Sequence, residues 1–172
     1  NRVGNFIQDI KRSHLCGDLR NEDLDSEVVL MGWVQNRRDH GGCVFIDLRD
    51  RSGLSQVVFD PQINEEAHAV AGDLRSEWVL AVQGKVRSRG GNINPRLKTG
   101  EIEIAATRME VLSRSETPPF LIEDDVDTSE EVRLGYRYLD LRRTPLQQNL
   151  MRRHLFNQLT RQVLVEGGFL EL

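Results

Sequence analysis

The chain has 172 residues, a formal net charge of −4, 38% apolar residues and 29% charged residues. This composition excludes collagen-like, low-complexity and wholly disordered chains, and the length suits one domain or one small domain plus part of another. The longest apolar run has five residues, so we expect neither a transmembrane helix nor a signal peptide. Cys16 and Cys43 form neither a disulfide framework nor a zinc pattern, which favours a cytoplasmic location.

Short apolar runs alternate with polar residues from about residue 28 to residue 113, a pattern typical of half-buried strands. Asp39-His40-Gly41-Gly42 is a Gly-rich turn, so the first two runs are predicted to form a hairpin. Apolar residues at helical spacing predict a helix over 64–75. The five predicted strands are 28–38, 43–49, 54–60, 78–89 and 101–112. Five strands with a helix between the third and the fourth is the order of an OB-fold barrel, a mainly β fold.

The composition changes after residue 113. Two prolines are followed by six acids and no base as far as Glu131, which is typical of a connector. Thr128 and Thr144 are candidate N-caps of two helices, and the second helix is predicted to run to about Glu166. One buried stripe is expected along it: Leu146, Leu150, Leu155, Leu159 and Val163. We therefore expect a barrel over 1–113, a linker over 114–131, and the start of a further, truncated domain over 132–172.

Charge is unevenly distributed along the chain. Residues 81–100 hold five bases and no acid, whereas residues 132–165 hold seven arginines against one acid. A basic strand with its loop is a usable footprint for phosphates, and an ordinary solvated face is the alternative. The net charge of −4 therefore does not argue against a nucleic-acid partner.

OB-fold barrels bind single-stranded nucleic acid or oligosaccharide on the face of their second and third strands. Phe45 is predicted to face outward there with Asp47 and Arg49, where its ring could stack on a base. The opposite side of that strand carries the aliphatic residues Val44, Ile46 and Leu48. Gln56 on the next strand offers both a donor and an acceptor to a base edge. A Phe at the edge of the core is the alternative for Phe45.

Further polar candidates lie on the first strand and around the fourth: Arg38, Arg87, Arg89, Asn92 and Asn94. Each Arg could contact a phosphate or a base or be ordinarily solvated, and each Asn could serve recognition or turn geometry. His40 lies in a Gly-rich turn, where solvation is expected. There is no phosphate-cradling Gly-Lys-Ser/Thr motif, nucleophile elbow or paired Cys and His set, so we expect no catalytic residue and no metal site.

The segment from Gly32 to Pro61, GWVQNRRDHGGCVFIDLRDRSGLSQVVFDP, strongly resembles the anticodon-binding barrel of bacterial-type aspartyl-tRNA synthetases. The blocks Asn92-Ile-Asn94, Thr99-Gly-Glu-Ile-Glu103 and Tyr136-Arg-Tyr-Leu-Asp-Leu-Arg-Arg143 resemble the same family. The resemblance runs from about His14 to the last residue. The Arg-Tyr-Leu-Asp-Leu block is shared with lysyl enzymes, so it identifies the class II subclass more than the amino acid.

The resemblance implies that Phe45 stacks on the central anticodon base and that Gln56 reads its edge. It places at anticodon-loop contact positions the residues Arg38, Arg87, Arg89, Asn92 and Asn94. The helix after Pro145 resembles the dimer-forming first motif of class II synthetases. These features imply the tRNA-binding N-terminal part of an aspartate–tRNA ligase, cut at the start of its α+β catalytic domain. The parent would be a cytoplasmic homodimer that uses ATP and Mg²⁺, while this chain would bind no cofactor and catalyse nothing.

His40 and Gly91 stand where many tRNA-Asp-specific members of the family have an aliphatic residue and a Lys. The pair resembles the relaxed type, which implies that the parent also charges tRNA-Asn. Two other hypotheses remain open: a stand-alone OB module that binds single strands, and a related lysyl or asparaginyl synthetase.

Overall fold

A computed structural model describes residues 11–171 of the chain. The chain forms two compact units, Asn1–Pro118 and Pro119–Leu172. The division falls inside segment 114–131, for which the sequence predicts a linker.

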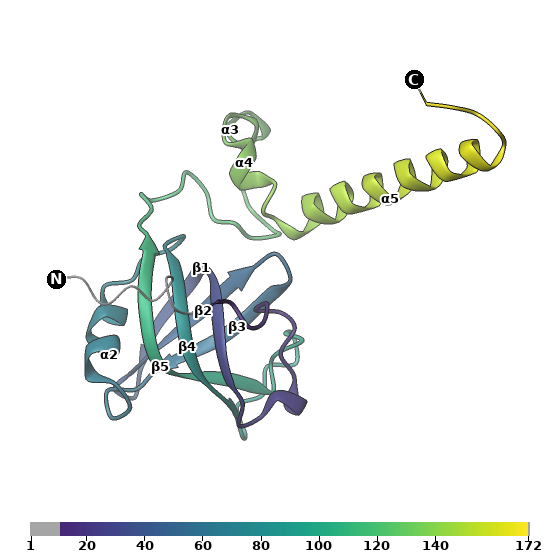
Figure 1. The fold of residues 1–172 in the computed structure, drawn as a ribbon. Helices are drawn as coiled ribbons and strands as arrows, with labels where there is room; N and C mark the ends of the chain where they lie inside the picture. Colours follow the sequence, from purple (N-terminus) through teal and green to yellow (C-terminus); the bar gives the residue numbers. More distant parts are fainter. Residues whose placement is uncertain (1–10, 172) are drawn as a thin grey trace. The chain divides into compact units, whose positions relative to one another are not determined.

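The first unit is a closed barrel of five strands in the order β1-β2-β3-β5-β4 (Figure 1). Its strands are β1 (Glu27–His40), β2 (Cys43–Asp50), β3 (Gly53–Phe59), β4 (Val79–Ser88) and β5 (Ile102–Ser113). All neighbouring strands are antiparallel except β3 and β5, which are parallel. The predicted OB-fold is confirmed, with strand ends within two residues of the expected ones.

The long strand β1 closes the barrel. Its first half pairs with β4 from Glu27 to Trp33, and its second half pairs with β2 from Trp33 to His40. The register against β2 shifts between Val34 and Asn36, and such a bulge bends a strand and increases its twist. One strand can therefore serve both neighbours, and the closed sheet has no long unpaired edge.

The inner side of β2 carries three buried aliphatic side chains in succession. Val44, Ile46 and Leu48 are 3%, 0% and 0% exposed and belong to the single large core of the barrel. The alternation predicted from the sequence is therefore confirmed, and the intervening side chains lie on the outer side of the strand. The turn that precedes β2 consists of Gly41 and Gly42, whose φ angles are +59° and +79°. A two-residue hairpin turn of this kind needs left-handed backbone, which glycine adopts without strain.

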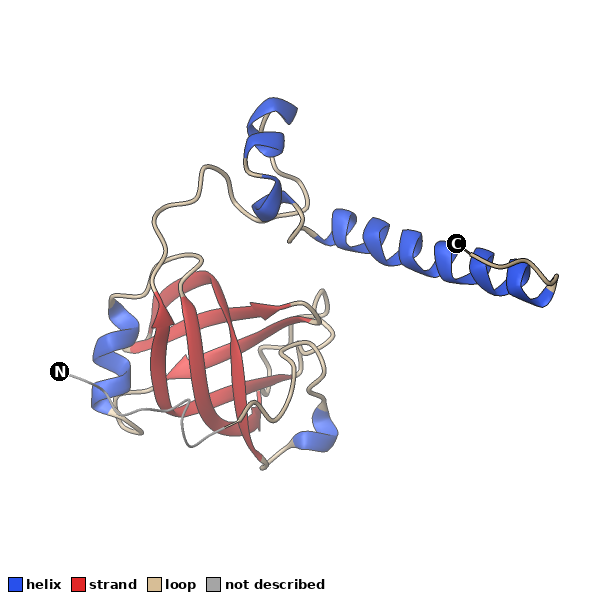
Figure 2. Cartoon of the chain, turned by 45° about the horizontal axis from the view of Figure 1, so that its top comes forward, coloured by secondary structure: helices blue, strands red, loops and turns tan. Residues whose placement is uncertain are grey.

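The helix α2 (Glu65–Gly72) packs against β2, β3 and β5 (Figure 2). It begins after Asn64, whose side-chain oxygen accepts a hydrogen bond from the backbone N–H of Ala67 at 2.9 Å. Ala67 and Ala71 are its buried residues. The predicted helix between the third and fourth strands is confirmed, although it ends before residue 75.

The N-terminal segment, with a short 3₁₀ turn η1 (Asn21–Asp23), is tied to the β2–β3 turn. The backbone N–H of Cys16 donates to Asp50 Oδ2 at 2.8 Å, and that of Gly17 donates to Ser52 Oγ at 2.7 Å. The Ser55 hydroxyl donates to the Cys16 carbonyl at 2.6 Å. A Cβ atom at Gly17 would come within 2.3 Å of the Ser52 carbonyl oxygen, so this close approach requires glycine.

The second unit contains α3 (Glu130–Gly135), α4 (Arg137–Asp140) and α5 (Thr144–Glu166). Ser129 rather than Thr128 caps α3, since its hydroxyl accepts from the backbone N–H of Val132 at 3.4 Å. Thr144 is the first residue of α5 rather than its cap, and the capping residue Arg143 makes no side-chain cap hydrogen bond. Both cap predictions were wrong by one residue. The end of α5 at Glu166 is as predicted.

Part of the segment expected to be a linker folds onto this second unit. A small apolar cluster contains Phe120, Ile122 and Leu139. Arg143 holds the same region, because its guanidinium donates to the carbonyl of Glu123 at 2.8 Å and to the carboxylate of Asp140 at 2.9 Å. The segment just after Pro119 therefore packs within the second unit.

The stripe expected to be buried along α5 is not buried. Leu146 is half-buried, and the other members Leu150, Leu155, Leu159 and Val163 are 49%, 55%, 61% and 66% exposed. The prediction was wrong for this chain because neither α3 nor α4 packs extensively against α5. Within residues 11–171, no helix combines the length and the apolar character needed to cross a membrane.

Candidate nucleic-acid interface

The outer face of β2 and β3 presents a half-buried aromatic ring. Phe45 lies directly between Arg38 of β1 and Val58 of β3 in the strand ladders. The side chain of Phe45 is neither core nor fully exposed, so part of its ring is accessible. An accessible ring on a sheet is a platform on which a base of single-stranded nucleic acid can stack.

Beside Phe45, a buried carboxylate holds an arginine. Asp47 is 7% exposed, and its two oxygens accept hydrogen bonds from Arg38 Nη2 at 2.7 Å and from Asn36 Nδ2 at 3.3 Å. Asp47 lies on the outer side of β2 as predicted, yet it is covered by these two side chains of β1. The ion pair keeps the guanidinium of Arg38 over the face, although about half of that side chain remains exposed.

The amide of Gln56 lies next in the same row. Gln56 pairs with Asp47 in the β2–β3 ladder and is 6% exposed. Its Oε1 accepts a hydrogen bond from Arg38 Nη2 at 3.3 Å, and its Nε2 donates to Glu103 Oε2 at 2.8 Å. Both ends of the amide are therefore engaged by neighbouring strands.

Glu103 of β5 completes the row. Its other oxygen, Oε1, accepts from Arg87 Nε of β4 at 2.8 Å, and these two residues are partners in the β4–β5 ladder. Glu103 is 9% exposed. A continuous set of hydrogen-bonded side chains, which we call the polar row, therefore crosses all five strands: Asn36, Arg38, Asp47, Gln56, Glu103 and Arg87.

The polar row changes the expected role of two arginines. Arg38 and Arg87 each donate to a buried carboxylate, so the four charged members of the row sum to zero. An arginine whose charge is already balanced contributes less to phosphate binding than an unpaired one. The N–H groups that the carboxylates leave unused can still donate to a base edge.

Sequence reasoning missed Asn36, Asp47 and Glu103 as members of the site. The sequence could have indicated Asp47, because this residue shares the outer side of β2 with Phe45. The indication for Glu103 is weaker: it is an acid between two isoleucines on a predicted strand. Its position beside Gln56, 47 residues away in sequence, depends on the parallel pairing of β3 with β5, which no local pattern reveals.

The β4–β5 loop holds three predicted residues apart from the polar row. Arg89 follows the last residue of β4 and is half-buried, whereas Asn92 is exposed. The side-chain oxygen of Asn94 accepts from the backbone N–H of Arg96 at 3.1 Å. The backbone N–H of Asn94 donates to the carbonyl of Gly100 at 3.0 Å. Asn94 therefore serves the turn geometry of the loop.

His40 and Gly91 flank the face from different loops. The turn next to His40 leads into β2, which is antiparallel to β3, so this turn lies near the end of β3. The loop of Gly91 leads into β5, which is parallel to β3, so this loop lies near the start of β3. The turn and the loop therefore lie toward opposite ends of β3. His40 lines a hollow of about 480 Å³ with His68 and Gly72 of the α2 segment. The structure does not place the two residues in one contact.

Other features of the chain offer less chemistry. Burial raises the pKa of the Cys43 thiol, and Asp60 raises it further, which disfavours the reactive thiolate form. Within the part of the chain that the structure describes, no group of three or more His, Cys, Asp or Glu residues is placed to hold a metal ion.

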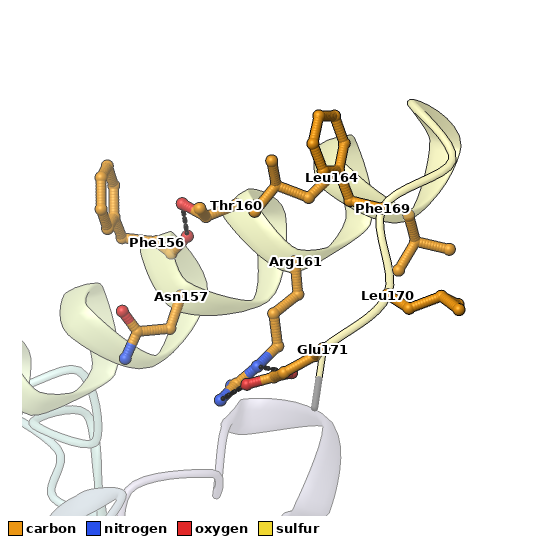
Figure 3. A pocket seen from close by; sticks show the side chains of 9 residues that line it. Phe156, Asn157, Thr160, Arg161, Leu164, Phe169, Leu170 and Glu171 are labelled. Atoms are coloured by element: carbon orange, nitrogen blue, oxygen red, sulfur yellow. Dashed lines mark hydrogen bonds and ion pairs between the residues drawn. The ribbon is translucent and has the colours of Figure 1, made fainter.

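A hollow of about 410 Å³ lies along the end of α5, where the chain turns back (Figure 3). Its wall is held by the ion pair between Arg161 and Glu171, at 2.8 Å. Figure 3 shows Phe156, Leu164, Phe169 and Leu170 around it, and these side chains are largely exposed. The hollow combines these apolar side chains with the polar residues Asn157 and Thr160 and the Arg161–Glu171 pair.

Comparisons with known proteins agree with this geometry. Residues 28–112 match the family model for the OB-fold nucleic acid binding domain, and residues 129–172 match that for class II tRNA synthetases (D, K and N). The chain is 60% identical over 167 residues to the aspartate–tRNA(Asp/Asn) ligase of Anaeromyxobacter sp. (strain K), covering 97% of this chain and 28% of that protein. The barrel thus matches the OB-fold nucleic acid binding domain family, and the chain is similar to part of an aspartate–tRNA(Asp/Asn) ligase.

Another aspartate–tRNA(Asp/Asn) ligase, from Thermoanaerobacter pseudethanolicus, is 54% identical over 171 residues, covering 99% of this chain and 29% of that protein. The chain thus spans less than a third of the length of these synthetase relatives. Among solved structures, it is similar to asparaginyl-tRNA synthetase from Pyrococcus horikoshii complexed with asparaginyl-adenylate. That match has a TM-score of 0.80 and 25% identity, and it covers 95% of this chain and 36% of the other.

Proposed function

We propose that the barrel binds the anticodon loop of a tRNA on the outer face of β2 and β3. In this proposal the ring of Phe45 stacks on the central anticodon base, and the amide of Gln56 with the guanidinium of Arg38 contacts the edge of that base. The observation that carries the proposal is the accessible ring beside an amide that neighbouring strands hold at both ends. Stacking combined with edge contacts is how proteins recognise unpaired bases.

The loop residues extend the proposed contact surface. Arg87, Arg89, Asn92 and Asn94 lie on β4 and the loop after it. Asn92 is exposed and available, whereas Asn94 would act mainly by shaping the loop. Their proposed contacts are with the anticodon loop around the central base.

We propose that the whole protein is an aspartate–tRNA ligase, which activates aspartate with ATP and Mg²⁺ and transfers it to the tRNA 3′ end. The names of the synthetase relatives support this activity, and the match of residues 129–172 to class II synthetases favours it over a stand-alone single-strand-binding module. No residue of this chain is assigned to ATP or Mg²⁺, so the chain alone should not aminoacylate. The exposed apolar side chains of α5 are consistent with a homodimeric parent.

We further propose that the ligase accepts tRNA-Asn as well as tRNA-Asp. The relatives at 60% and 54% identity carry both tRNAs in their names. His40 and Gly91 would act on the RNA loop from the two flanks of the face.

Binding of an anticodon stem-loop tests the barrel's role. The 172-residue chain is titrated into fluorescently labelled stem-loop of tRNA-Asp at a stated salt concentration, with a stem-loop of unrelated anticodon as the control. Preferential binding of the tRNA-Asp stem-loop supports the proposal, and equal affinity for both RNAs contradicts it.

Charging of tRNA tests the activity of the parent. The full-length ligase that contains this chain is assayed with transcripts of tRNA-Asp and tRNA-Asn and with radiolabelled aspartate. Charging of both supports the relaxed type, and charging of tRNA-Asp alone removes His40 and Gly91 from that role.

A further inference from the structure

The chain leaves the barrel at the end of β5 through a short segment that is neither helix nor strand (Figure 1). β5 ends at Ser113 and the first unit ends at Pro118, so residues 114–118, which we call the exit segment, still belong to the unit of the barrel. Residues 114–117 are exposed. An exposed segment without secondary structure is expected to be mobile unless side chains tie it down.

Trp78, the residue before β4, ties down the start of the exit segment by two contacts. Its indole Nε1–H donates to the carbonyl of Ser115 at 3.1 Å. The guanidinium carbon of Arg114 lies 5.0 Å from the centre of the Trp78 ring, within the range of about 6 Å for a cation–π interaction. We call the arrangement of Trp78, Arg114 and Ser115 the exit clamp.

The indole of the exit clamp is attached to a well-anchored part of the barrel. The backbone of Trp78 donates to the carbonyl of Arg75 at 3.2 Å and accepts from the N–H of Val34 at 2.9 Å, and its half-buried ring packs against the large core. The preceding residue, Glu77, has a φ angle of +65°, which a residue other than glycine keeps only where its surroundings fix it. Its buried carboxylate binds Arg49 of β2 at 2.8 Å. The barrel therefore holds Trp78 in place, and Trp78 holds the exit segment.

Two prolines continue the restriction beyond the exit clamp. Only Glu116 and Thr117 separate Ser115 from Pro118 and Pro119. A proline has a fixed φ, and a residue that precedes a proline is restricted to extended backbone. Because both Thr117 and Pro118 precede a proline, few freely rotating bonds follow the clamp. A restraint at Ser115 is therefore passed along the chain to Pro119.

Such a restraint matters to an enzyme that handles its substrate at two distant points. In the proposed ligase the barrel binds the anticodon loop, whereas the amino acid is joined to the 3′ end of the same tRNA. A displacement of about 1 Å caused by a change far from the chemistry can lower a rate by about 10²-fold. A loose exit segment would leave anticodon binding intact but would reduce the fraction of bound tRNA that reacts.

We propose that Trp78 and Arg114 are positioning residues, which fix the exit segment on the barrel and so make a tRNA that is bound at its anticodon productive for charging. This inference rests on the proposed function, because it concerns transfer to tRNA by the whole ligase. Neither residue needs to contact RNA, aspartate or ATP in this role. Their effect is therefore separable from the binding of each substrate.

The first test uses the full-length ligase that contains this chain and compares the wild type with Trp78→Phe and Arg114→Gln. Three quantities are measured: aspartate-dependent exchange of pyrophosphate into ATP without tRNA, affinity for the anticodon stem-loop of tRNA-Asp, and kcat and KM for charging of tRNA-Asp. Trp78→Phe should keep the exchange rate and the stem-loop affinity of the wild type. Its kcat for charging should fall by about 5- to 100-fold, because part of the bound tRNA is misplaced, whereas KM should change little.

Arg114 supplies a graded comparison within the same test. Arg114→Gln should lower kcat by a smaller factor than Trp78→Phe does, because the hydrogen bond from Trp78 to Ser115 remains. Arg114→Lys keeps a cation over the ring and should restore most of the lost kcat. Arg51→Gln, at an exposed position of the β2–β3 turn, is the matched control and should leave all three quantities unchanged.

The outcomes separate the inference from the proposed function. If the wild type fails to bind the stem-loop or to charge tRNA-Asp, the proposed function fails. If the wild type does both, and Trp78→Phe and Arg114→Gln keep its kcat, only the positioning inference is overturned. A fall in charging that is matched by an equal fall in stem-loop affinity or in exchange also overturns it, because that result shows a general loss of fold.

A second test needs no RNA and follows the exit segment directly. A protease that cleaves after glutamate is added to the 172-residue chain, and cleavage after Glu116, next to the exit clamp, is timed. Trp78→Phe and Arg114→Gln should each speed this cleavage by about 2- to 10-fold, the effect on local opening of losing one hydrogen bond or one cation–π contact. Cleavage after Glu130, in the second unit, is the internal reference and should keep its rate. An unchanged rate after Glu116 in both variants would contradict the clamp on which the inference depends.

Discussion

Glu103 of β5 and Arg87 of β4 face each other as ladder partners, and Glu103 Oε1 lies 2.8 Å from Arg87 Nε. The other oxygen of the same carboxylate accepts from Gln56. The carboxylate of Glu103 therefore balances the charge of Arg87, which the sequence predicts to contact RNA. The same carboxylate accepts a hydrogen bond from the amide of Gln56. The consequence is a face that is nearly neutral at its centre.

Phe45→Ala should weaken binding of the tRNA-Asp anticodon stem-loop by about 1–3 kcal/mol, the usual contribution of one stack between a base and an aromatic ring. The measurement is the dissociation constant by fluorescence anisotropy at fixed salt. Phe156→Ala is the control, because Phe156 is 70% exposed on α5 and outside the barrel. An unchanged affinity for Phe45→Ala would remove this residue from the interface.

Gln56→Ala should reduce discrimination at the central anticodon base more than it reduces affinity for RNA in general. The reason is that edge contacts carry sequence information, whereas phosphate contacts do not. Affinities for four stem-loops, one for each central base, measure the effect. Equal losses for all four RNAs would contradict a reading role.

Salt dependence should distinguish the paired arginine from an exposed lysine. Lys98→Gln in the β4–β5 loop should lower the slope of log affinity against log salt by about 0.7, the value for one phosphate contact to a single strand. Arg87→Gln should change that slope much less, because its guanidinium is already paired with Glu103. Titrations at four salt concentrations provide both slopes, and equal changes would show that Arg87 also contacts a phosphate.

Glu77→Gln should destabilise the barrel by about 3–5 kcal/mol, the usual effect of removing one partner from a buried ion pair. Both oxygens of Glu77 accept from Arg49 Nη2 at 2.8 Å, and the two side chains are only 5% and 11% exposed. Urea unfolding followed by fluorescence measures the change, with the exposed Glu66→Gln as the control. A loss below about 1 kcal/mol, the range of surface ion pairs, would show that the pair is solvated.

The barrel should lose stability in acid, because protonation of Asp50 removes a stabilising contribution. Burial alone would raise the pKa of this carboxyl, but hydrogen bonds from the Ser52 hydroxyl and from the backbone N–H groups of Cys16 and Ser52 outweigh burial and hold the pKa below its usual 3.8. The unfolded chain therefore takes up the proton more readily. The stabilisation is complete above about pH 5 and is lost as the pH falls through the folded-state pKa.

Asp50→Asn should accordingly lower the free energy of unfolding at pH 7 and flatten its decline between about pH 5 and pH 2. Urea unfolding at a series of pH values measures both effects. Asp73→Asn, at an exposed acid just after α2, is the control and should keep the wild-type profile. The same decline in Asp50→Asn and the wild type would mean that other carboxyls dominate acid unfolding.

Local patterns predicted most of the barrel. The alternation in β2 correctly separated its buried side, marked by Ile46, from its outer side, marked by Phe45, because side chains of a strand point to opposite faces. Where local signals compete, the prediction was less accurate. Thr128 and Ser129 are adjacent capping residues of similar propensity, and only the backbone geometry selects Ser129.

Apolar spacing also misled where it marks a surface rather than a core. The stripe of α5 has the period of a buried helix face, yet Leu159 is 61% exposed. The spacing of apolar residues shows only that one face of the helix is apolar. What covers that face is decided by other elements, and neither α3 nor α4 packs extensively against it.

The sequence by itself determined the succession of strands and helix along the chain, the outward position of Phe45 and the family that the chain resembles, because these depend on neighbours along the chain and on short motifs. Only the tertiary structure decided which groups meet on the face. Gln56, Glu103 and Arg87 come from three strands, and they become neighbours through the parallel pairing of β3 with β5 and the register of β4 with β5. Hydrogen bonds act over about 3 Å, so the orientation of an amide is a property of the closed barrel rather than of any one strand.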